Sequence, residues 1–186
     1  MFSFFLTASI FGQHQENTQL GIEIDPAPYI LKGYSVSVKY SPKQTPKVAY
    51  MASIYQSDFP EGMMTKSNKN NGWKEMKIER SYAAFAEFYL NDRRKGFYVG
   101  PSVFWYNKSV AQEAINDRMK FSTIYPNIRA GYIWYPFKEL DVYLNPWFNI
   151  GSEINVDKNN QLHGNEFEPN KLNYILAIHI GYKIEL

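Results

Sequence analysis

Alternation between apolar and polar residues dominates this chain, and it is clearest from Phe121 to Gly151. In that stretch every second residue is mostly apolar, and the residues between are mostly polar or small. An alternation of period two predicts β-strands, because successive side chains of a strand point to opposite faces of its sheet. A short turn at Tyr135 to Glu139 divides the stretch. It therefore predicts a long two-stranded hairpin whose two faces meet different surroundings.

The same alternation recurs along the chain and predicts eight strands in up-and-down order. Besides that hairpin, the alternating segments are Leu20 to Tyr29, Gly33 to Tyr40, Val48 to Gln56, Arg80 to Leu90, Phe97 to Tyr106 and Asn173 to Leu186. Successive connections between these strands alternate between two sets. The first set is short: Ser41 to Lys47, Asn91 to Gly96 and Tyr135 to Glu139. The second holds the short Ile30 to Gly33 and three long segments, Ser57 to Glu79, Asn107 to Lys120 and Ser152 to Lys171. An even strand number with short turns at one end and longer loops at the other is typical of outer-membrane barrels.

Residue types indicate which face of these strands points inward. A soluble barrel also alternates, with its apolar face inside. Here the non-aliphatic positions are rich in Gly, Ser and Ala, with single charges among them, which suits a narrow interior filled by side chains. We therefore expect an all-β fold, an eight-stranded antiparallel up-and-down transmembrane β-barrel with its aliphatic face toward lipid. The alternative is a soluble lipocalin-like barrel that binds a ligand.

Five prolines fall inside the predicted strands at lipid-facing positions, and each removes a hydrogen-bond donor from the sheet. They are Pro26, Pro28, Pro101, Pro126 and Pro146. We expect β-bulges at these positions, or the end of a strand at one or two of them.

Composition narrows the class of protein. A chain of 186 residues fits one domain, and an aromatic content of 17% favours a membrane interface, where Tyr and Trp concentrate. A net charge of +2 with scattered Lys and Arg argues against nucleic acid as a partner. The absence of cysteine excludes disulfides, thiol catalysis and cysteine-bound zinc.

The first residues differ from the rest of the chain. Met1 to Gly12 is apolar and is followed abruptly by polar residues, as at the end of a secretory signal peptide. The expected organisation is a signal-peptide-like segment over residues 1–12, cleaved near Gly12 and Gln13, and a single barrel domain over residues 13–186. The basic start of a signal peptide is missing, so a buried N-terminal strand is the alternative.

Charged and titratable residues at inward-facing positions form the candidate site. They are Glu23, Asp25, Lys39, Glu87, Arg129, Asp141, His179, Lys183 and Glu185. Several should meet in the lumen, since a charge surrounded by a wall of low dielectric is tolerated only when it is paired or hydrated. We expect a structural polar network that plugs the barrel and prevents a stable pore. The alternative is a path for protons or ions.

No catalytic, cofactor-binding or metal-binding residue is predicted. Asp157, Asn159 and Gln161 have the spacing of calcium ligands, but Leu162 occupies the position that requires glycine. His179 is the only histidine in a predicted strand, and no serine neighbours it in sequence. A lipid-modifying enzyme is thus an alternative to a barrel with a structural or surface-interaction role.

Partners are expected at the lipid-facing wall and at the loops. The wall should meet outer-membrane lipid and lipopolysaccharide. Ser57 to Glu79 mixes aromatic residues and methionines with lysines and asparagines, so this loop, like Ser152 to Lys171, could contact lipopolysaccharide phosphates or another protein. The alternative for Ser57 to Glu79 is a mobile polar cap.

Several segments carry a family resemblance: GIEIDPAPYILKGYSVSVKY, FYVGPSVFWY, RAGYIWYPFK, VYLNPW and IHIGYKIEL. They resemble small outer-membrane β-barrel proteins of the Bacteroidota type, and the architecture is similar to the OmpA and OmpX class of eight-stranded barrels. The resemblance implies insertion into the bacterial outer membrane by the barrel-insertion machinery. It carries over no catalytic residue.

Overall fold

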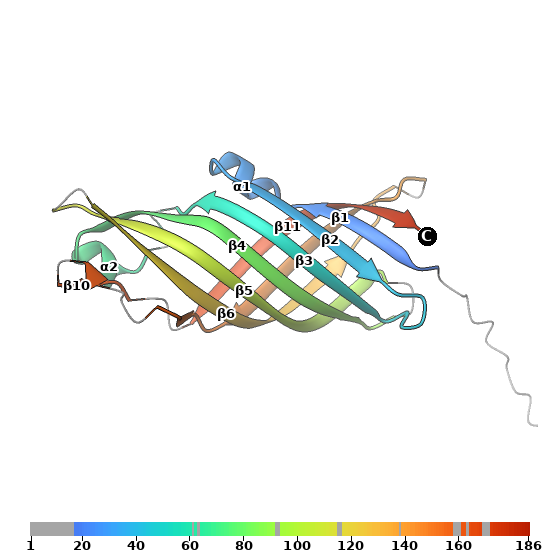
Figure 1. The fold of residues 1–186 in the computed structure, drawn as a ribbon. Helices are drawn as coiled ribbons and strands as arrows, with labels where there is room; N and C mark the ends of the chain where they lie inside the picture. The colour runs from blue at the N-terminus through green and yellow to red at the C-terminus, as the bar shows by residue number, and fades with distance from the viewer. Residues whose placement is uncertain are drawn as a thin grey trace, which may run out of the picture.

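Eight antiparallel strands form a closed barrel in the computed structural model (Figure 1). The structure describes residues 17–60, 62, 64–91, 94–114, 117–137, 139–157, 161–162, 164–168 and 172–186, so the predicted signal-like segment 1–12 lies outside the described residues. The barrel strands are β1 (Gln19–Ile24), β2 (Tyr34–Ser41), β3 (Val48–Asp58), β4 (Trp73–Tyr89), β5 (Gly96–Gln112), β6 (Asp117–Ile133), β7 (Val142–Gly151) and β11 (Asn173–Glu185). Each pairs with its neighbours along the chain, and β1 pairs with β11 to close the barrel. The predicted fold class is confirmed.

The two ends of the barrel differ. Both ends of the described chain lie at one of them, where Leu186 N donates to Thr18 O and where the short connections 42–47, 90–95 and 134–141 also lie. We call this the terminal end. At the opposite end, the loop end, the connections hold the helices α1 (Pro26–Ile30) and α2 (Lys66–Asn70) and the short strands β8 (Ile154–Asn155), β9 (Gln161–Leu162) and β10 (Asn165–Glu166). Neither helix in this described part is long and apolar enough to cross a membrane.

Aliphatic side chains cover the outside of the wall, as the alternation predicts. Val36 on β2 is 44% exposed, whereas its neighbour Ser37 is 1% exposed. The same contrast holds on β11, where Ile180 faces outward and His179 is buried. The interior therefore holds the polar and charged positions together with inward-facing aromatic rings.

Strands β5 and β6 extend through the predicted loop Asn107 to Lys120, so that loop prediction is wrong. They continue as a hairpin to Gln112 and from Asp117. Val110 and Met119 pair across it and both are buried. Near the loop end, the residues of β5 from Lys108 to Gln112 are buried on both faces of the strand, so the alternation that marks a strand is lost there. β4 likewise starts at Trp73, inside the predicted loop Ser57 to Glu79.

Prolines in the wall interrupt pairing without making bulges. Pro101, Pro126 and Pro146 each coincide with a gap in one ladder, yet the register is the same on both sides of the gap. Each missing N–H therefore removes hydrogen bonds only beside the proline and does not shift the register of the strands. The predicted bulges at these three prolines are wrong. The observed register shifts lie near the loop end of β3 and β4, where Glu75 has a φ of 49°.

The first predicted strand, Leu20 to Tyr29, is too long. β1 ends at Ile24, and the side chain of Asp25 caps α1 by accepting a hydrogen bond from Ala27 N at 3.0 Å. Proline suits the first turn of a helix, where its missing N–H is not needed. The alternative that a strand ends at a proline applies here, to Pro26 and Pro28.

A second apolar cluster closes over the loop end. Its buried members are Met64, Trp73, Met76, Val110, Met119, Phe121 and Phe167. Trp73 Nε1 donates to Glu166 O at 3.0 Å, and Asn68 on α2 exchanges two hydrogen bonds with the backbone of Glu168, at 2.8 and 3.1 Å. We call α2 together with the described residues of 161–168 the cap. Phe167 of the cap and Trp73 of β4 are thus packed inward, while a mobile polar cap stays an alternative that the packing does not test.

Candidate functional site: the barrel interior

Glu23 is the centre of the polar network inside the barrel. It comes from β1, is fully buried, and accepts bonds from four side chains on three other strands. Its Oε1 lies 2.6 Å from Lys39 Nζ and 2.8 Å from Tyr143 OH. Its Oε2 lies 3.1 Å from Asn145 Nδ2 and 2.8 Å from His179 Nδ1. This density of donors is what a carboxylate needs in a wall of low dielectric.

Lys39 joins Glu23 to a second buried carboxylate. Lys39 Nζ is 2.9 Å from Glu87 Oε2, which also accepts a hydrogen bond of 2.6 Å from Tyr89 OH. All of these groups are less than a tenth exposed. The ammonium group therefore bridges two carboxylates that face each other across the lumen from β1 and β4.

Arg129 on β6 is held by aromatic rings. Its Cζ lies 4.4 Å from the ring centroid of Trp147, 4.6 Å from that of Phe85 and 5.6 Å from that of Tyr98. Its Nη1 is 3.8 Å from Glu87 Oε1, within ion-pair distance but too far for a hydrogen bond. Faces of aromatic rings attract a guanidinium group, so this cage stabilises the buried charge.

Glycines make the space that the inward tyrosines occupy. Gly181 pairs with Tyr143 across the β11 to β7 ladder, and a Cβ on Gly181 would lie 2.2 Å from Tyr143 Cζ. In the same way a Cβ on Gly131 would lie 2.3 Å from Tyr98 OH. The small inward residues noticed in the sequence thus let large rings cross the lumen.

The predicted site residues divide into three groups. Five meet in the network just described: Glu23, Lys39, Glu87, Arg129 and His179. Asp25 does not join them, because it lies beyond the end of β1 and caps α1. Lys183, Asp141 and Glu185 form a separate cluster at the terminal end, with Lys183 Nζ at 3.2 and 2.9 Å from the two carboxylates.

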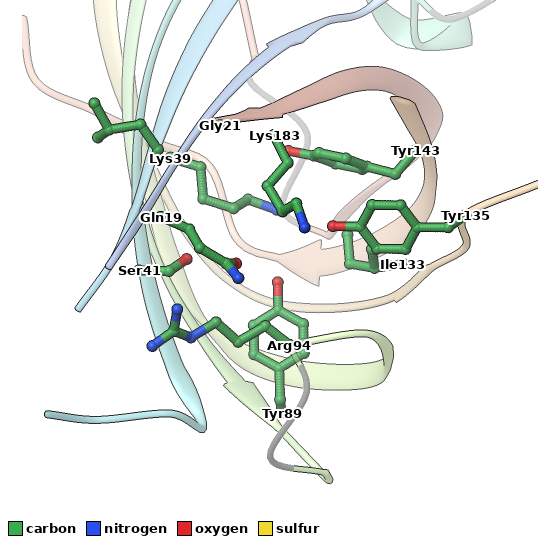
Figure 2. Close-up of a pocket in the computed structure, with 11 residues that line it drawn as sticks. Gln19, Gly21, Lys39, Ser41, Tyr89, Arg94, Ile133, Tyr135, Tyr143 and Lys183 are labelled. Carbon is green, nitrogen blue, oxygen red and sulfur yellow. The ribbon is translucent and has the colours of Figure 1, made fainter. Parts of the chain in front are cut away.

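A small pocket opens between these two groups at the terminal end (Figure 2). Lys39, Lys183, Tyr89 and Tyr135 turn toward one another around it. Its volume is about 20 Å³, which is room for one or two water molecules. Both lysines are already paired with carboxylates, and Arg94, which also lines it, donates to the carbonyl oxygens of Asn17 and Pro42. The pocket therefore has room for water but is too small for a large ligand.

Sequence reasoning missed a second buried ion pair, between Lys108 and Glu153. It lies in the upper lumen near the loop end, and Glu153 Oε1 also accepts a hydrogen bond of 2.6 Å from Thr123. Both charged residues fall in segments predicted as loops. Continued inward parity along β5, from Tyr98 through Tyr106 to Lys108, was the signal for the lysine. No comparable signal marked Glu153, which lies outside a strand.

The interior offers few groups for chemistry. In the described residues no cluster of three or more His, Asp or Glu could hold a metal ion. His179 packs edge to face on Trp147, with 5.4 Å between ring centroids, and its Nδ1 is bound to Glu23. What this arrangement does best is join β1, β2, β4, β6, β7 and β11 through buried charges and their partners in the lumen.

Comparisons with known proteins agree with this architecture. No protein-family model and no curated protein sequence matches the chain. Among solved structures, it is similar to the N-terminal β-barrel domain of Pseudomonas aeruginosa OprF, with 12% identity, a TM-score of 0.52 and coverage of 91% of this chain and 98% of that one. It is also similar to Neisserial surface protein A, with 10% identity, a TM-score of 0.50 and coverage of 91% and 95%.

Identities this low are evidence for the fold alone. The chain has the closed eight-stranded fold of the small outer-membrane β-barrels, and this confirms the architectural part of the resemblance found in the sequence. Kinship with proteins of the Bacteroidota type stays a prediction.

Proposed function

We propose that this protein is a small β-barrel of the bacterial outer membrane with a structural or surface-interaction role. One observation carries the proposal: the distribution of side chains is inverted relative to a water-soluble protein. Val99, Ile128 and Ile150 are exposed on the outside, whereas Glu23 and Arg129 are buried inside. Soluble monomers rarely expose an apolar surface that surrounds the whole molecule. A lipid bilayer supplies the apolar solvent that this wall requires.

The lumen is proposed to be plugged. The network around Glu23, the Arg129 cage and the Lys108 to Glu153 pair lie at successive heights along it, and rings of Phe104 and Tyr125 fill space between them. An eight-stranded barrel has an interior that side chains can fill. We expect no stable conductance in planar bilayers. Steady openings of porin size would contradict this part of the proposal.

The surface role is assigned to the cap, facing the outside of the cell. Trp73 and Met64 are buried beneath it, so a partner would meet its polar exterior. Lys66 and Lys69 on α2 are exposed and lie on one short helix. They could bind the phosphates of lipopolysaccharide, since lysines bind phosphate as point charges. Connections 59–72 and 152–172 are the proposed sites for another protein.

Binding by the cap can be measured with vesicles that contain lipopolysaccharide. Lys66→Gln together with Lys69→Gln should weaken binding of the refolded protein to the phosphates of the lipopolysaccharide in these vesicles. Lys43→Gln together with Lys95→Gln removes two exposed lysines from the terminal end and serves as the matched control. Equal binding by both variants and the parent would remove the cap lysines as the site.

We propose no enzymatic activity and no role for His179 in catalysis. A lipid-modifying enzyme needs a nucleophile and a base together near the lipid. In the described part of the chain no hydroxyl group hydrogen-bonds to His179, which lies buried in the lumen. Sensitive assay of lipid A from cells that overproduce the protein tests this, and a new lipid A species would contradict it.

Cell fractionation tests the location directly. The protein should sediment with outer-membrane markers and resist extraction by carbonate. In SDS gels it should migrate differently before and after boiling, as folded membrane barrels do. A protein that appears in the periplasmic fraction and is soluble without detergent would overturn the membrane proposal in favour of a soluble barrel.

A further inference from the structure

One part of the barrel wall is incomplete. β11 runs from Asn173 to Glu185, but its pairing with β1 stops where Ile24 meets Ile180. Above that point, toward the loop end, β11 pairs only with β7 on its other side. In the part of the chain that the structure describes, no other strand takes the place of β1 there.

The missing neighbour leaves backbone groups unpaired. In an antiparallel sheet, alternate residues direct their N–H and C=O to opposite neighbours. Lys183 N donates to Asp141 O beside β7, and Leu186 N donates to Thr18 O beside β1, so even-numbered residues of β11 face β1. The backbone groups of Tyr174, Leu176 and Ile178 therefore point into the gap. Water is absent inside a membrane and cannot pair with polar backbone groups there, so this edge must find other partners.

Two prolines create the gap. If β1 continued in register, residue 26 would lie opposite Ile178 and residue 28 opposite Leu176. At these two positions the N–H would have to donate to β11, and both residues are proline. The chain turns away into α1 instead, which stands out from the wall beside the end of β1 (Figure 1).

Beside the gap, residues of β11 are more exposed than those in the rest of the wall. Lumen-facing residues of a complete wall are buried, as Trp147 and Asn149 are on β7. On the upper part of β11, by contrast, the lumen-facing Asn173, Ile175 and Ala177 are only half-buried. On the outside, Leu176 is 76% exposed, against 40% for Ile180, where β1 is present. We call this gap between α1 and the upper part of β11 the lateral opening.

Unsatisfied donors lie directly behind the lateral opening. Trp147 pairs with Ala177 and Asn149 pairs with Ile175 across the β11 to β7 ladder. Trp147 Nε1 and Asn149 Nδ2 are both buried, and neither has a hydrogen-bond partner among the described residues. A ligand with acceptor oxygens would therefore satisfy them. The outer edges of the opening, which we call its apolar lips, are formed by Ile30 on α1 and Leu176 on β11, and both side chains are highly exposed.

We propose that the lateral opening binds one membrane lipid, with an acyl chain between its apolar lips and the adjoining ester or amide oxygens near Trp147 and Asn149. A lipid of this kind also carries acceptors for the open edge of β11. This inference rests on the proposed location in a membrane. A strand of a second copy is a poorer occupant, since it would have to lie about 4.8 Å from β11. α1 borders that place, held to β3 by the hydrogen bond from Asp58 N to Leu31 O at 2.9 Å, so a further strand would have to displace it.

Tryptophan quenching by brominated phosphatidylcholine tests the proposal. Bromine atoms quench only rings that lie close to them, so they are placed on the acyl carbons next to the ester, the part of the chain that the proposal places near Trp147. A variant with Trp147 as its only tryptophan, W73F/W105F/W134F, reports on the lumen behind the opening. A second variant, W73F/W134F/W147F, keeps only the outward-facing Trp105 and reports on insertion into the bilayer. Both are refolded into vesicles and checked by the gel shift on boiling.

The expected result is strong quenching of both tryptophans. Two further changes, made in the variant that retains Trp147, should abolish its quenching: P26T/P28T restores the N–H groups that let β1 extend, and A177F fills the opening without altering the prolines. A177F decides the outcome if the proline variant does not fold.

Several results would overturn the inference. If Trp105 is quenched and Trp147 is not, the membrane location stands and lipid binding fails. If neither is quenched, the proposed function fails as well. Quenching of Trp147 that neither P26T/P28T nor A177F reduces would show that lipid does not reach it through the opening. Dimers in light scattering with an unquenched Trp147 would assign the edge of β11 to a second copy.

Discussion

Replacing Glu23 by glutamine tests whether the interior network holds the barrel together. The two side chains have nearly the same shape, so the change removes a charge and one acceptor without leaving a cavity. Oε1 accepts bonds from Lys39 and Tyr143, and Oε2 from Asn145 and His179. Whichever way the glutamine amide turns, its NH₂ group faces atoms that were donors. Lys39 also loses one of its two carboxylate partners.

The size of the effect follows from burial. Removing one partner of a buried ion pair costs about 3 to 5 kcal/mol, because the other charge is left uncompensated. Glu185→Gln is the matched control, since the side chain of Glu185 also binds a lysine but is 52% exposed. An exposed pair contributes about 0 to 1 kcal/mol. With a urea slope of about 1 to 3 kcal/mol per molar, Glu23→Gln should lower the unfolding midpoint by at least about 1 M.

The assay is urea unfolding of the protein in lipid vesicles, followed by tryptophan fluorescence and by the gel shift. Lys39→Met should also be costly, and the double variant with Glu23→Gln should cost less than the sum of the two single changes, because the pair is removed together. The reasoning is refuted if Glu23→Gln and Glu185→Gln lower the free energy of unfolding equally. It is also refuted if the two single changes at the pair are additive.

Other predictions concern the wall, the packing of the lumen and the cap. Ile180→Lys should impair insertion into vesicles by about 2 to 4 kcal/mol, whereas Ile184→Lys, on the same face but near the terminal end, should cost about 0 to 1; equal folding yields would contradict the assignment of the lipid face. Gly181→Val should lower the urea midpoint, since its Cβ would collide with a tyrosine ring at 2.2 Å and overpacking costs about 1 to 3 kcal/mol; an unchanged midpoint would show that the ring has other space. Asn68→Ala removes both hydrogen bonds between α2 and residue 168, so limited proteolysis should cut the cap sooner than in Lys69→Ala, an exposed neighbour, and equal cutting would argue against a packed cap.

Alternation was sufficient to predict the barrel because the two faces of its wall differ so strongly. Along the barrel strands, the residues of one parity are mostly apolar and exposed and those of the other parity are buried, so the sequence indicates which residue lies on which side. The same rule placed Glu23, Lys39 and Arg129 in the lumen. Alternation could not predict which of these side chains contact one another. That depends on the register between strands that are distant in sequence, which fixes the position of each residue along the barrel axis.

The features that sequence did not reveal have specific physical causes. Near the loop end both faces of β5 are covered, so Lys108 to Gln112 lost the alternation that marks a strand. Pro26 and Pro28 were compatible with a bulge or a strand end, and only the register with β11 decides between them. The ring of Trp147 was not recognised as part of the cage around Arg129, because an aromatic residue at an inward position fits either a packed core or a cation site.

The unequal lengths of the strands also set an order of events for assembly. β5 and β6 are each 17 residues long and adjacent in the chain, so their hairpin forms with little loss of loop entropy. The seam that closes the barrel joins β1, of 6 residues, to β11 at the far end of the chain. It is short, with six residue pairs, and it spans the greatest sequence separation of any strand pair in the barrel. We therefore expect this seam to close last during folding, and the amides of β1 to exchange with solvent before those of any other barrel strand.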